Sequence, residues 1–466
     1  MSALRIALAQ TNPRMADIEA NAARLRALRA QAASHGADLL LTPEHSLSGA
    51  VPATLAADPD FAAACDAALM DLAAETSGIG PALILGAPWR DGLHLHDALA
   101  LLEGGSIRAR RAAHEPRPGF DPGPVPGPVA FRGIRLGLMA GRDWRGPATA
   151  ETLAETGAEI LIALDSLPFE TGGEERRLQA ALSRVVENDL PLLLLNRLGA
   201  EEEDVHDGAA LILNADRSPA LQLPPFAESL TLTEWTQDGA TWRCVPRPTP
   251  PAMPSEEQLW RALLLALRDH AARHGAGAFL LPLAATPESL LAATLAADAF
   301  GPAALRALHH QHDTSAAEAA RELALATESL DLAPAGDALA AAVPQAASCL
   351  VAALSQAVIQ ALAEATKALP ILTGPGTTPT AFAPLRHLSP AQHRALAVWR
   401  NAHRPPGLLG PEQVALPLDQ PAGTPQMNKA TPAGHGPALW QSLARADYKR
   451  RHSPPGLNIA PRAFRT

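Results

Sequence analysis

Residues 37–49 read Ala-Asp-Leu-Leu-Leu-Thr-Pro-Glu-His-Ser-Leu-Ser-Gly, a short apolar run followed directly by polar residues. The run of three leucines predicts a buried β-strand. The proline after the run and the glycine at its far end then mark the end of the strand and a loop. Glu44 therefore falls at the carboxyl end of a predicted strand.

The residues on either side of this strand alternate between strand-like and helix-like patterns. Residues 4–10 predict another buried strand, and residues 19–35 and about 58–76 predict helices. Further strands are predicted at residues 82–86, 98–103, 134–140, 159–164, 191–196 and 209–214. Strands that alternate with helices indicate an α/β domain in which helices pack on sheets. We expect this domain to span residues 1–245.

A proline-rich stretch, residues 246–255, is predicted to be a stiff linker between this domain and the rest of the chain. Ser255 is the predicted N-cap of a helix that runs to about His274. A strand, a loop and a second helix are predicted to follow, at residues 278–283, 284–289 and 290–300. Elements in this order commonly bind phosphate at the helix N-terminus. We expect a second domain over residues 256–466.

The composition narrows the possible functions. The chain has 466 residues and a net charge of −10, so no basic surplus is present to neutralise nucleic-acid phosphates. Its three widely spaced cysteines predict neither a disulfide framework nor a zinc site. No apolar run is long enough for a signal peptide or a membrane helix. We therefore expect a cytoplasmic protein with no nucleic-acid or membrane partner.

Several short motifs of the first domain occur in the order found in the nitrilase, or carbon–nitrogen hydrolase, superfamily. Residues 43–49 are similar to the family sequence Pro-Glu-Leu-Ser-Leu-Thr-Gly, and three further segments match in order: residues 85–88, 166–169 and 207–208. The domain most closely resembles the glutaminase domain of glutamine-dependent NAD⁺ synthetases. This resemblance implies a nitrilase-like αββα sandwich.

Glutaminases of this family use a glutamate base, a lysine that stabilises the oxyanion and a cysteine nucleophile. The resemblance places Glu44 at the position of the base. Ala112 takes the place of the lysine, and a shift of the alignment by one or two residues brings Arg110 or Arg111 there instead. Gly141, within Gly-Leu-Met-Ala-Gly-Arg-Asp at residues 137–143, takes the place of the cysteine. Glu44 is the one surviving triad member, and we expect an inactive amidase.

Other reactive residues of the first domain have simpler interpretations. Cys65 and Cys244 are interpreted as structural residues, and His206, which precedes Asp-Gly, as a turn residue. Lysine cannot contribute, because it occurs only at positions 367, 429 and 449. Without its partners, Glu44 itself is interpreted as a hydrogen-bonded anchor of its loop.

The second domain resembles the synthetase part of the same family, which implies a Rossmann-like fold of the adenine nucleotide alpha hydrolase type. The family loop Ser-Gly-Gly-x-Asp-Ser reads Ala-Ala-Thr-Pro-Glu-Ser at residues 284–289, so both glycines are lost. Pro287 also has no N–H to donate to a phosphate. The residual cofactor-binding positions implied by the resemblance are Ser289, Thr373, Gly374 and Lys449.

Lys449 belongs to the segment that matches the family most specifically, residues 448–456, although a basic residue there can also complement a helix dipole. The family uses ATP and Mg²⁺, but the degenerate loop predicts no cofactor here. The spacing of His309, His310 and His312 is one that zinc sites use. Because no carboxylate or thiol pattern accompanies these histidines, we expect no metal site.

Both domains keep the order of the family's sequence motifs, but the catalytic residues of the first and the nucleotide-binding residues of the second are replaced. We therefore expect a catalytically inactive paralogue of glutamine-dependent NAD⁺ synthetase that serves NAD biosynthesis as a structural or regulatory partner. The resemblance implies a homo-oligomer or co-assembly with an active synthetase. Two alternatives remain: a ligase that amidates nicotinic acid adenine dinucleotide with ATP and free ammonia, and a binding module that senses a dinucleotide.

Overall fold

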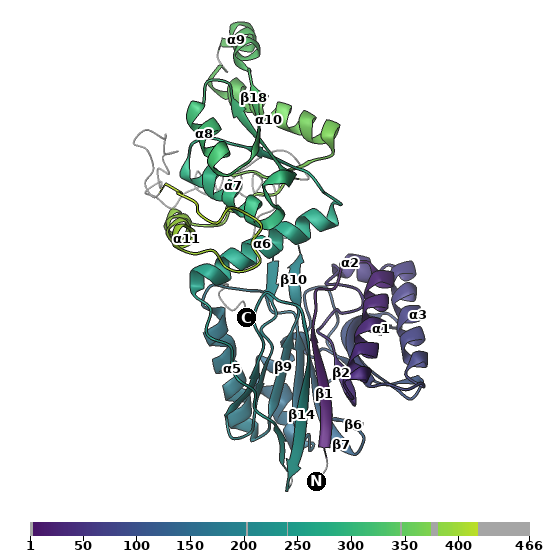
Figure 1. Ribbon diagram of the computed structural model, residues 1–466. Coiled ribbons are helices and arrows are strands. Elements are labelled where there is room, and N and C mark those ends of the chain that lie inside the picture. Colours follow the sequence, from purple (N-terminus) through teal and green to yellow (C-terminus); the bar gives the residue numbers. More distant parts are fainter. Residues whose placement is uncertain (1–2, 202–203, 240, 345–346, 374–380, 418–466) are drawn as a thin grey trace, which may run out of the picture. The chain divides into compact units, whose positions relative to one another are not determined.

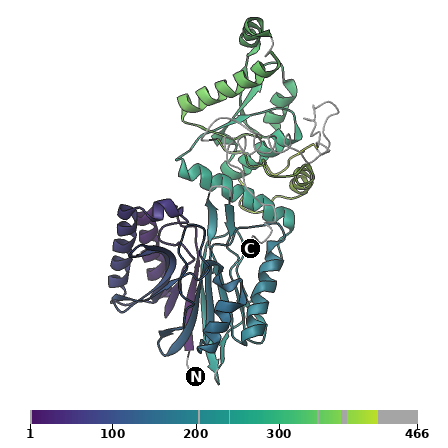
Figure 2. The ribbon, with the colours of Figure 1, turned by 180° about the vertical axis from the view of Figure 1, so that it is seen from behind.

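The computed structural model describes residues 3–201, 204–239, 241–344, 347–373 and 381–417. The chain forms two compact units, of which the first contains most residues up to Met253 and the second begins at Pro254. Each unit is of mixed α/β type (Figures 1 and 2). No helix in this described part of the chain is long and apolar enough to cross a membrane.

The first unit contains a seven-stranded and a six-stranded sheet. The strands of the first sheet, in spatial order, are β15 (Thr241–Cys244), β14 (Ser229–Asp238), β1 (Ala3–Gln10), β2 (Leu39–Leu41), β3 (Ala82–Asp91), β4 (His94–Glu103) and β5 (Ser106–Ala112). Those of the second sheet are β13 (Pro219–Gln222), β12 (Leu211–Leu213), β9 (Leu192–Asn196), β8 (Ile160–Asp165), β7 (Ile134–Ala140) and β6 (Val129–Phe131). A separate pair consists of β10 (Leu198–Glu201) and β11 (Asp204–Asp207).

The two sheets pack face to face, and helices cover their outer faces. Alternate residues of β1 point to opposite sides, so Ile6 and Leu8 lie in the core between the sheets while Ala7 and Ala9 face helices. The seven-stranded sheet is covered by α1 (Ile18–Ser34) and α3 (Pro59–Glu75). The six-stranded sheet is covered by α4 (Pro147–Glu155) and α5 (Gly173–Asn188). These layers form an αββα sandwich, which confirms the predicted fold of this unit.

Two short helices complete the first unit. They are α2 (Ala53–Ala56) and η1 (Gly141–Trp144). The 3₁₀ helix η1 follows β7 directly and begins at Gly141, the residue that takes the place of the family cysteine.

The second unit is built on a parallel sheet in the order β18-β17-β16-β19. Its strands are β16 (Phe279–Pro282), β17 (Leu305–His310), β18 (Ala326–Leu330) and β19 (Leu369–Pro370). Its helices are α6 (Ser255–Arg273), α7 (Pro287–Phe300), η2 (Pro302–Ala304), α8 (Thr314–Glu322), α9 (Ala333–Ala342), α10 (Ala347–Thr366) and α11 (Pro390–Ala402). A parallel sheet with helices between its strands confirms the Rossmann-like class.

Two expectations about helix starts in this unit are wrong. Ser255 lies inside α6, and its hydroxyl contacts the Glu256 carboxylate at 2.9 Å instead of capping the helix. Helix α7 begins at Pro287, three residues earlier than predicted, because the Thr286 side chain caps it by accepting a hydrogen bond from the Ser289 N–H. Proline at the first helical position suits this start, since its fixed φ is helical and its missing N–H would have no partner there.

Candidate functional site

The carboxyl ends of strands from both sheets meet around Glu44. Glu44 follows β2, Gly141 follows β7, and Asp165 is the last residue of β8. The Glu44 side chain is buried. The loop that carries Glu44 lies against Gly86 of β3. A Cβ added at Gly86 would lie 2.4 Å from the backbone nitrogen of His45. Glycine at position 86 therefore allows the loop after β2 to lie this close to β3.

Gly141 occupies the position that faces the Glu44 carboxyl. Its φ of 51° lies in the left-handed region that favours glycine. A Cβ at this position would lie 2.5 Å from Oε1 of Glu44 and 3.1 Å from its Cδ. The carboxyl therefore fills the space that the side chain of a nucleophile would need.

Ala112, the last residue of β5, brings no charge to this cluster. It is buried against Gly123, where an added Cβ would lie 2.6 Å from the Ala112 Cβ. The two alternatives from the shifted alignment are engaged elsewhere: Arg110 pairs with Asp66 at 3.1 Å, and Arg111 donates a hydrogen bond to the Arg110 carbonyl. Neither contact brings a cation to Glu44.

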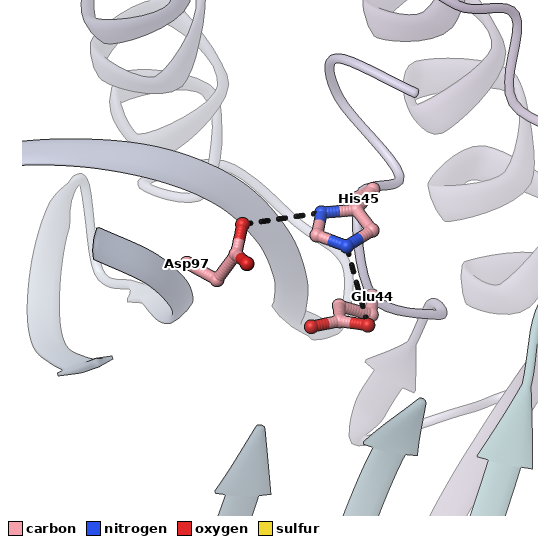
Figure 3. A group of neighbouring side chains, drawn as sticks. All are labelled: Glu44, His45 and Asp97. Carbon is pink, nitrogen blue, oxygen red and sulfur yellow. Dashed lines mark ion pairs between the residues drawn. The ribbon is translucent and has the colours of Figure 1, made fainter. Parts of the chain in front are cut away.

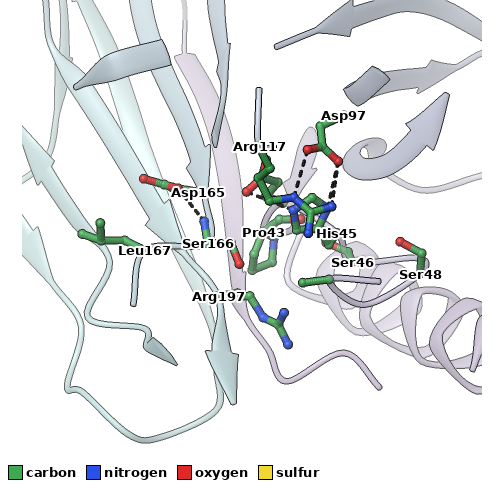
Figure 4. A network of polar contacts seen from close by, with 12 residues as sticks. Pro43, His45, Ser46, Ser48, Asp97, Arg117, Asp165, Ser166, Leu167 and Arg197 are labelled. Atoms are coloured by element: carbon green, nitrogen blue, oxygen red, sulfur yellow. Dashed lines mark hydrogen bonds and ion pairs between the residues drawn. The ribbon is translucent and has the colours of Figure 1, made fainter. Parts of the chain in front are cut away.

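Three arginines that sequence reasoning missed lie near Glu44. Burial and the charge of Asp165 raise the pKa of the Glu44 carboxyl to about 8. The positive charges of Arg117, Arg145 and Arg197 act in the opposite direction but are outweighed. Glu44 is therefore mostly a neutral carboxylic acid at pH 7. Each arginine is paired with another carboxylate. Arg117 pairs with Asp97 at 2.9 Å (Figure 4). Arg145 pairs with Asp165 at 3.1 Å, and Arg197 pairs with Glu201 at 2.7 Å.

These arginines carried a signal in the sequence that could have identified them. Arg117 lies within the segment that replaces the family lysine motif, Arg145 follows the segment that replaces the cysteine motif, and Arg197 comes directly after β9. A charged residue next to a buried strand needs a partner if it is itself buried. Their acidic partners lie far away in the sequence in two of the three pairs, so only the fold reveals the pairing.

His45 lies between two carboxyl groups (Figure 3). Its Nε2 is 3.2 Å from Oε2 of Glu44, and its Nδ1 is 3.7 Å from Oδ1 of Asp97. Burial and the positive charge of Arg117 lower the pKa of His45 to about 3, so the imidazole is neutral at pH 7. Its φ of 59° is uncommon for a residue with a side chain, which indicates that the surrounding contacts hold the loop in place.

Glu44, His45 and Asp97 are residue types that bind metals, and one ligand atom of each lies within 4.8 Å of the others. Their geometry does not suit a metal ion, because each carboxyl group faces a different nitrogen of the ring. Asp97 also accepts two hydrogen bonds from Arg117, at 2.9 and 3.0 Å, so a cationic side chain already holds it. The arrangement supports a structural role for Glu44 as an anchor of its loop.

Neither described thiol of the first unit is suited to act as a nucleophile. Burial raises the pKa of Cys65 and of Cys244 to about 12, so both thiols stay protonated. The interpretation of His206 as a turn residue is wrong, because it lies buried within β11. Burial and the charge of Arg197 lower the pKa of His206 to about 3, which leaves it neutral.

The loop before α7 uses its hydrogen-bonding groups internally. The Ser289 hydroxyl accepts from the Ala284 N–H at 3.0 Å and donates to the Pro282 carbonyl at 3.4 Å. The Ser289 N–H donates to the Thr286 hydroxyl at 3.3 Å, and Pro287 has no N–H. Ser289 is buried within the loop, and two backbone N–H groups of the loop, those of Ala284 and Ser289, are engaged by side chains.

The other cofactor-binding and metal-binding positions considered in the second domain are not seen to come together within the described residues. Thr373 is half-buried, whereas Gly374 and Lys449 lie outside the described residues. The Nδ1 of His309 is 3.0 Å from the His310 carbonyl. Within the described residues, the histidines at 309–312 do not belong to a group with metal-ligand spacing.

The sandwich and the strand-end carboxyl at its centre define a carbon–nitrogen hydrolase fold. The family model named Carbon-nitrogen hydrolase matches residues 5–243, and the chain belongs to this family. More particularly, the chain is similar to glutamine-dependent NAD(+) synthetases, as the sequence predicted. It is 35% identical over 305 residues to that of Rhodobacter capsulatus, an alignment that covers 64% of this chain and 55% of the relative. The alignment thus spans about half the length of that relative.

A second relative and a solved structure match over nearly the whole chain. The glutamine-dependent NAD(+) synthetase of Xylella fastidiosa strain Temecula1 is 25% identical over 530 residues, covering 99% of this chain and 97% of the relative. The structure of the Acinetobacter baumannii enzyme in complex with ADP has a TM-score of 0.80 at 19% identity, covering 100% of this chain and 97% of that one. At this identity the structural likeness establishes the fold, and it confirms the predicted combination of two α/β domains.

Proposed function

We propose that this chain is a catalytically inactive relative of glutamine-dependent NAD⁺ synthetase, and that it acts as a structural or regulatory partner in NAD biosynthesis. The observation that carries the proposal is the Glu44 carboxyl, whose Oε1 lies 2.5 Å from the Cβ position of residue 141. Amide hydrolysis through an acyl-enzyme needs a nucleophile and a group that stabilises the oxyanion. Gly141 supplies no nucleophile, and the first 366 residues contain no lysine.

The protonation states around Glu44 support the same conclusion. A general base must be deprotonated at the working pH and must reach the proton that it takes. Burial holds the pKa of Glu44 at about 8, so most of the carboxyl is protonated at neutral pH. His45 is no substitute, because both of its ring nitrogens face carboxyl groups of the same cluster.

The loop before α7 supports the loss of ligase activity. Adenylation with ATP needs free donors near the phosphates, which backbone N–H groups of glycine-rich loops usually provide. Here the Ala284 and Ser289 N–H groups are bonded to side chains of the loop itself. These two N–H groups could bind a phosphate only if their present bonds broke.

A chain that keeps both domain frameworks can still take the place of a subunit in an assembly. We therefore propose that the partner is an active NAD⁺ synthetase or a further copy of this chain. Three cysteines in 466 residues suit the reducing environment of the cytoplasm, which is where this partnership is proposed to operate.

The test is product formation measured by mass spectrometry. Purified protein is incubated with nicotinic acid adenine dinucleotide, ATP and Mg²⁺, with either glutamine or ammonium as the nitrogen source. An active glutamine-dependent NAD⁺ synthetase in a parallel reaction serves as the positive control. We expect no NAD⁺ from either nitrogen source.

The other outcomes separate the alternatives. NAD⁺ from ammonium alone would show that the ligase half is active and that the loop before α7 opens to bind ATP. NAD⁺ from glutamine would overturn the proposal entirely. Binding of the dinucleotide by calorimetry without turnover would instead support a sensing module.

A further inference from the structure

A pocket of about 270 Å³ opens in the second unit between α7, α8 and the chain segment that follows α11. Its apolar lining consists of Leu290, Ala319, Leu323, Val414, Ala415 and Leu416. Two polar residues, Glu322 and Gln413, complete the lining. Pockets for drug-sized ligands measure roughly 300–1,000 Å³ and combine a mainly apolar lining with a few polar groups. This pocket has the same kind of lining and is slightly smaller, so it suits a small organic molecule.

Hydrogen bonds hold the segment that forms one wall of the pocket. The Asn401 side chain of α11 binds the Leu416 backbone twice, because its Nδ2 donates to the carbonyl at 2.9 Å and its Oδ1 accepts from the N–H at 2.8 Å. Nearer the start of the segment, Arg400 donates to the Pro411 carbonyl at 2.7 Å. The protein itself therefore fixes this wall, and a ligand would not have to order it, which lowers the cost of binding.

Glu322 brings a negative charge to the pocket. It is the last residue of α8, where the helix dipole already places a partial negative charge. Within the described residues, its carboxylate takes part in no ion pair. A carboxylate at the C-terminal end of a helix is unfavourable for the helix itself and favours a cation beside it. The polar side of the pocket therefore suits a positively charged group.

The other charges around the pocket have the same sign overall. The first turn of α7, helix α8 and residues 404–416 together carry four carboxylates and two guanidinium groups: Glu288, Glu318, Glu322, Glu412, Arg321 and Arg404. Of these, Arg404 lies 3.6 Å from Glu412 and offsets its charge. A surface with this balance of charge attracts a cation and repels a phosphate or a carboxylate.

We propose that this pocket binds a small organic ammonium compound, with its apolar body against Leu290 and Val414 and its positive charge beside Glu322. Leu290 and Val414 are half-buried, so a bound apolar group would remove more of their surface from water. The Gln413 carbonyl oxygen can accept a hydrogen bond from the ammonium group. The inference is independent of the proposed function, because none of the lining residues belongs to the Glu44 cluster or to the loop before α7.

Titration of the full chain with 3-phenylpropylammonium, followed by ligand-observed NMR, tests the charge preference of the pocket. We expect saturable binding, and binding about tenfold weaker for two compounds of similar shape, the neutral 3-phenylpropanol and the anionic 3-phenylpropanoate. Glu322→Gln is expected to weaken binding of the ammonium compound about tenfold and to leave binding of the alcohol unchanged. The matched control is Glu318→Gln, which removes an exposed carboxylate of the same helix that does not line the pocket.

Val414→Trp tests whether the apolar part of the pocket is where the compound binds. The larger side chain is expected to fill the pocket and to weaken binding of the ammonium compound about tenfold or more. Val398→Trp is the control, because Val398 is an exposed residue of α11 that does not line the pocket. Thermal unfolding at the wild-type temperature shows that each variant is folded.

Four results would overturn the proposal. The first is the absence of saturable binding, and the second is an equal weakening by Glu318→Gln and Glu322→Gln, which would indicate attraction to the surface in general. The third is binding that is unchanged in Val414→Trp. The fourth is displacement of the compound by ATP, which would place it at a nucleotide site.

Discussion

Oε1 of Glu44 lies 2.5 Å from the point that a Cβ on Gly141 would occupy. The missing nucleophile at position 141 and the buried carboxyl at position 44 are therefore parts of one packing arrangement. A side chain at position 141 requires the Glu44 carboxyl to move, and this buried carboxyl already lies 3.2 Å from Nε2 of His45. A replacement at position 141 therefore also changes the position of the Glu44 carboxyl.

Gly141→Cys is expected to restore no amidase activity and to destabilise the first unit. A side chain at a φ of 51° costs roughly 1–2 kcal/mol, and forcing atoms into an occupied space costs about 1–3 kcal/mol more. Urea denaturation of Gly141→Ala and Gly141→Cys measures the loss in the free energy of unfolding, which includes the cost of the backbone conformation and the cost of the clash with Glu44. The control is Gly92→Ala, because Gly92 has a φ of 60° and nothing lies within 4 Å of its added Cβ. Equal losses at positions 92 and 141 would contradict a clash with Glu44.

Glu44→Gln is expected to become more stable relative to wild type as the pH rises. The pKa of Glu44 is raised from 4.5 to about 8 in the folded protein, so its contribution is fully present below pH 4.5 and is lost as the pH rises to 8. The maximum slope is about 1.4 kcal/mol per pH unit for one proton. The difference in the free energy of unfolding between the two proteins, measured at pH 5, 6.5, 8 and 9, checks this. A difference that does not change with pH would show that Glu44 is ionised throughout.

His206→Gln is expected to make the protein less sensitive to acid. Burial and Arg197 lower the pKa of His206 from 6.5 to about 3, so its contribution to stability is present above pH 6.5 and is lost as the pH falls towards 3. Removing the imidazole removes this loss. Thermal unfolding between pH 7 and pH 4 measures the effect, with the exposed His35→Gln as the control. An unchanged pH profile in the His206 variant would contradict a neutral, buried imidazole.

The second unit depends on a buried ion pair between Asp298 of α7 and Arg400 of α11. Their side chains are fully buried, Nε lies 2.8 Å from Oδ2, and Trp260 of α6 also donates to Asp298 at 3.0 Å. Arg400→Met is expected to reduce the free energy of unfolding by about 3–5 kcal/mol, because it leaves a buried carboxylate without its partner. The double variant Asp298→Leu/Arg400→Met is expected to regain part of that loss.

Urea denaturation of both variants checks the prediction for this ion pair. The exposed pair of Arg26 and Glu75 supplies the control, since Arg26→Met is expected to cost about 0–1 kcal/mol. A loss for Arg400→Met no larger than that of the control would contradict a structural role for the buried pair.

Much of the fold could be predicted because its signals are local. The leucine run at 39–41 and the helical spacing at 19–35 depend on residues close together in the sequence, and the structure has β2 and α1 there. Strand β3 is longer than predicted, since its second half, Ala87–Asp91, is held by antiparallel pairing with β4. His206 looked like a turn residue because it precedes Asp-Gly, but it lies in a strand.

The sequence by itself determined the two-domain family, the order of the elements, and the absence of a cysteine at position 141 and of lysine throughout the first domain. Only the tertiary structure showed which groups lie where the family has its cysteine and lysine. The carboxyl of Glu44 closes the space beside Gly141, and its pKa depends on Asp165 and on arginines at positions 117, 145 and 197. The physical reason is that burial and charge interactions act through space between residues that folding brings together, whereas sequence patterns report mainly on neighbours along the chain.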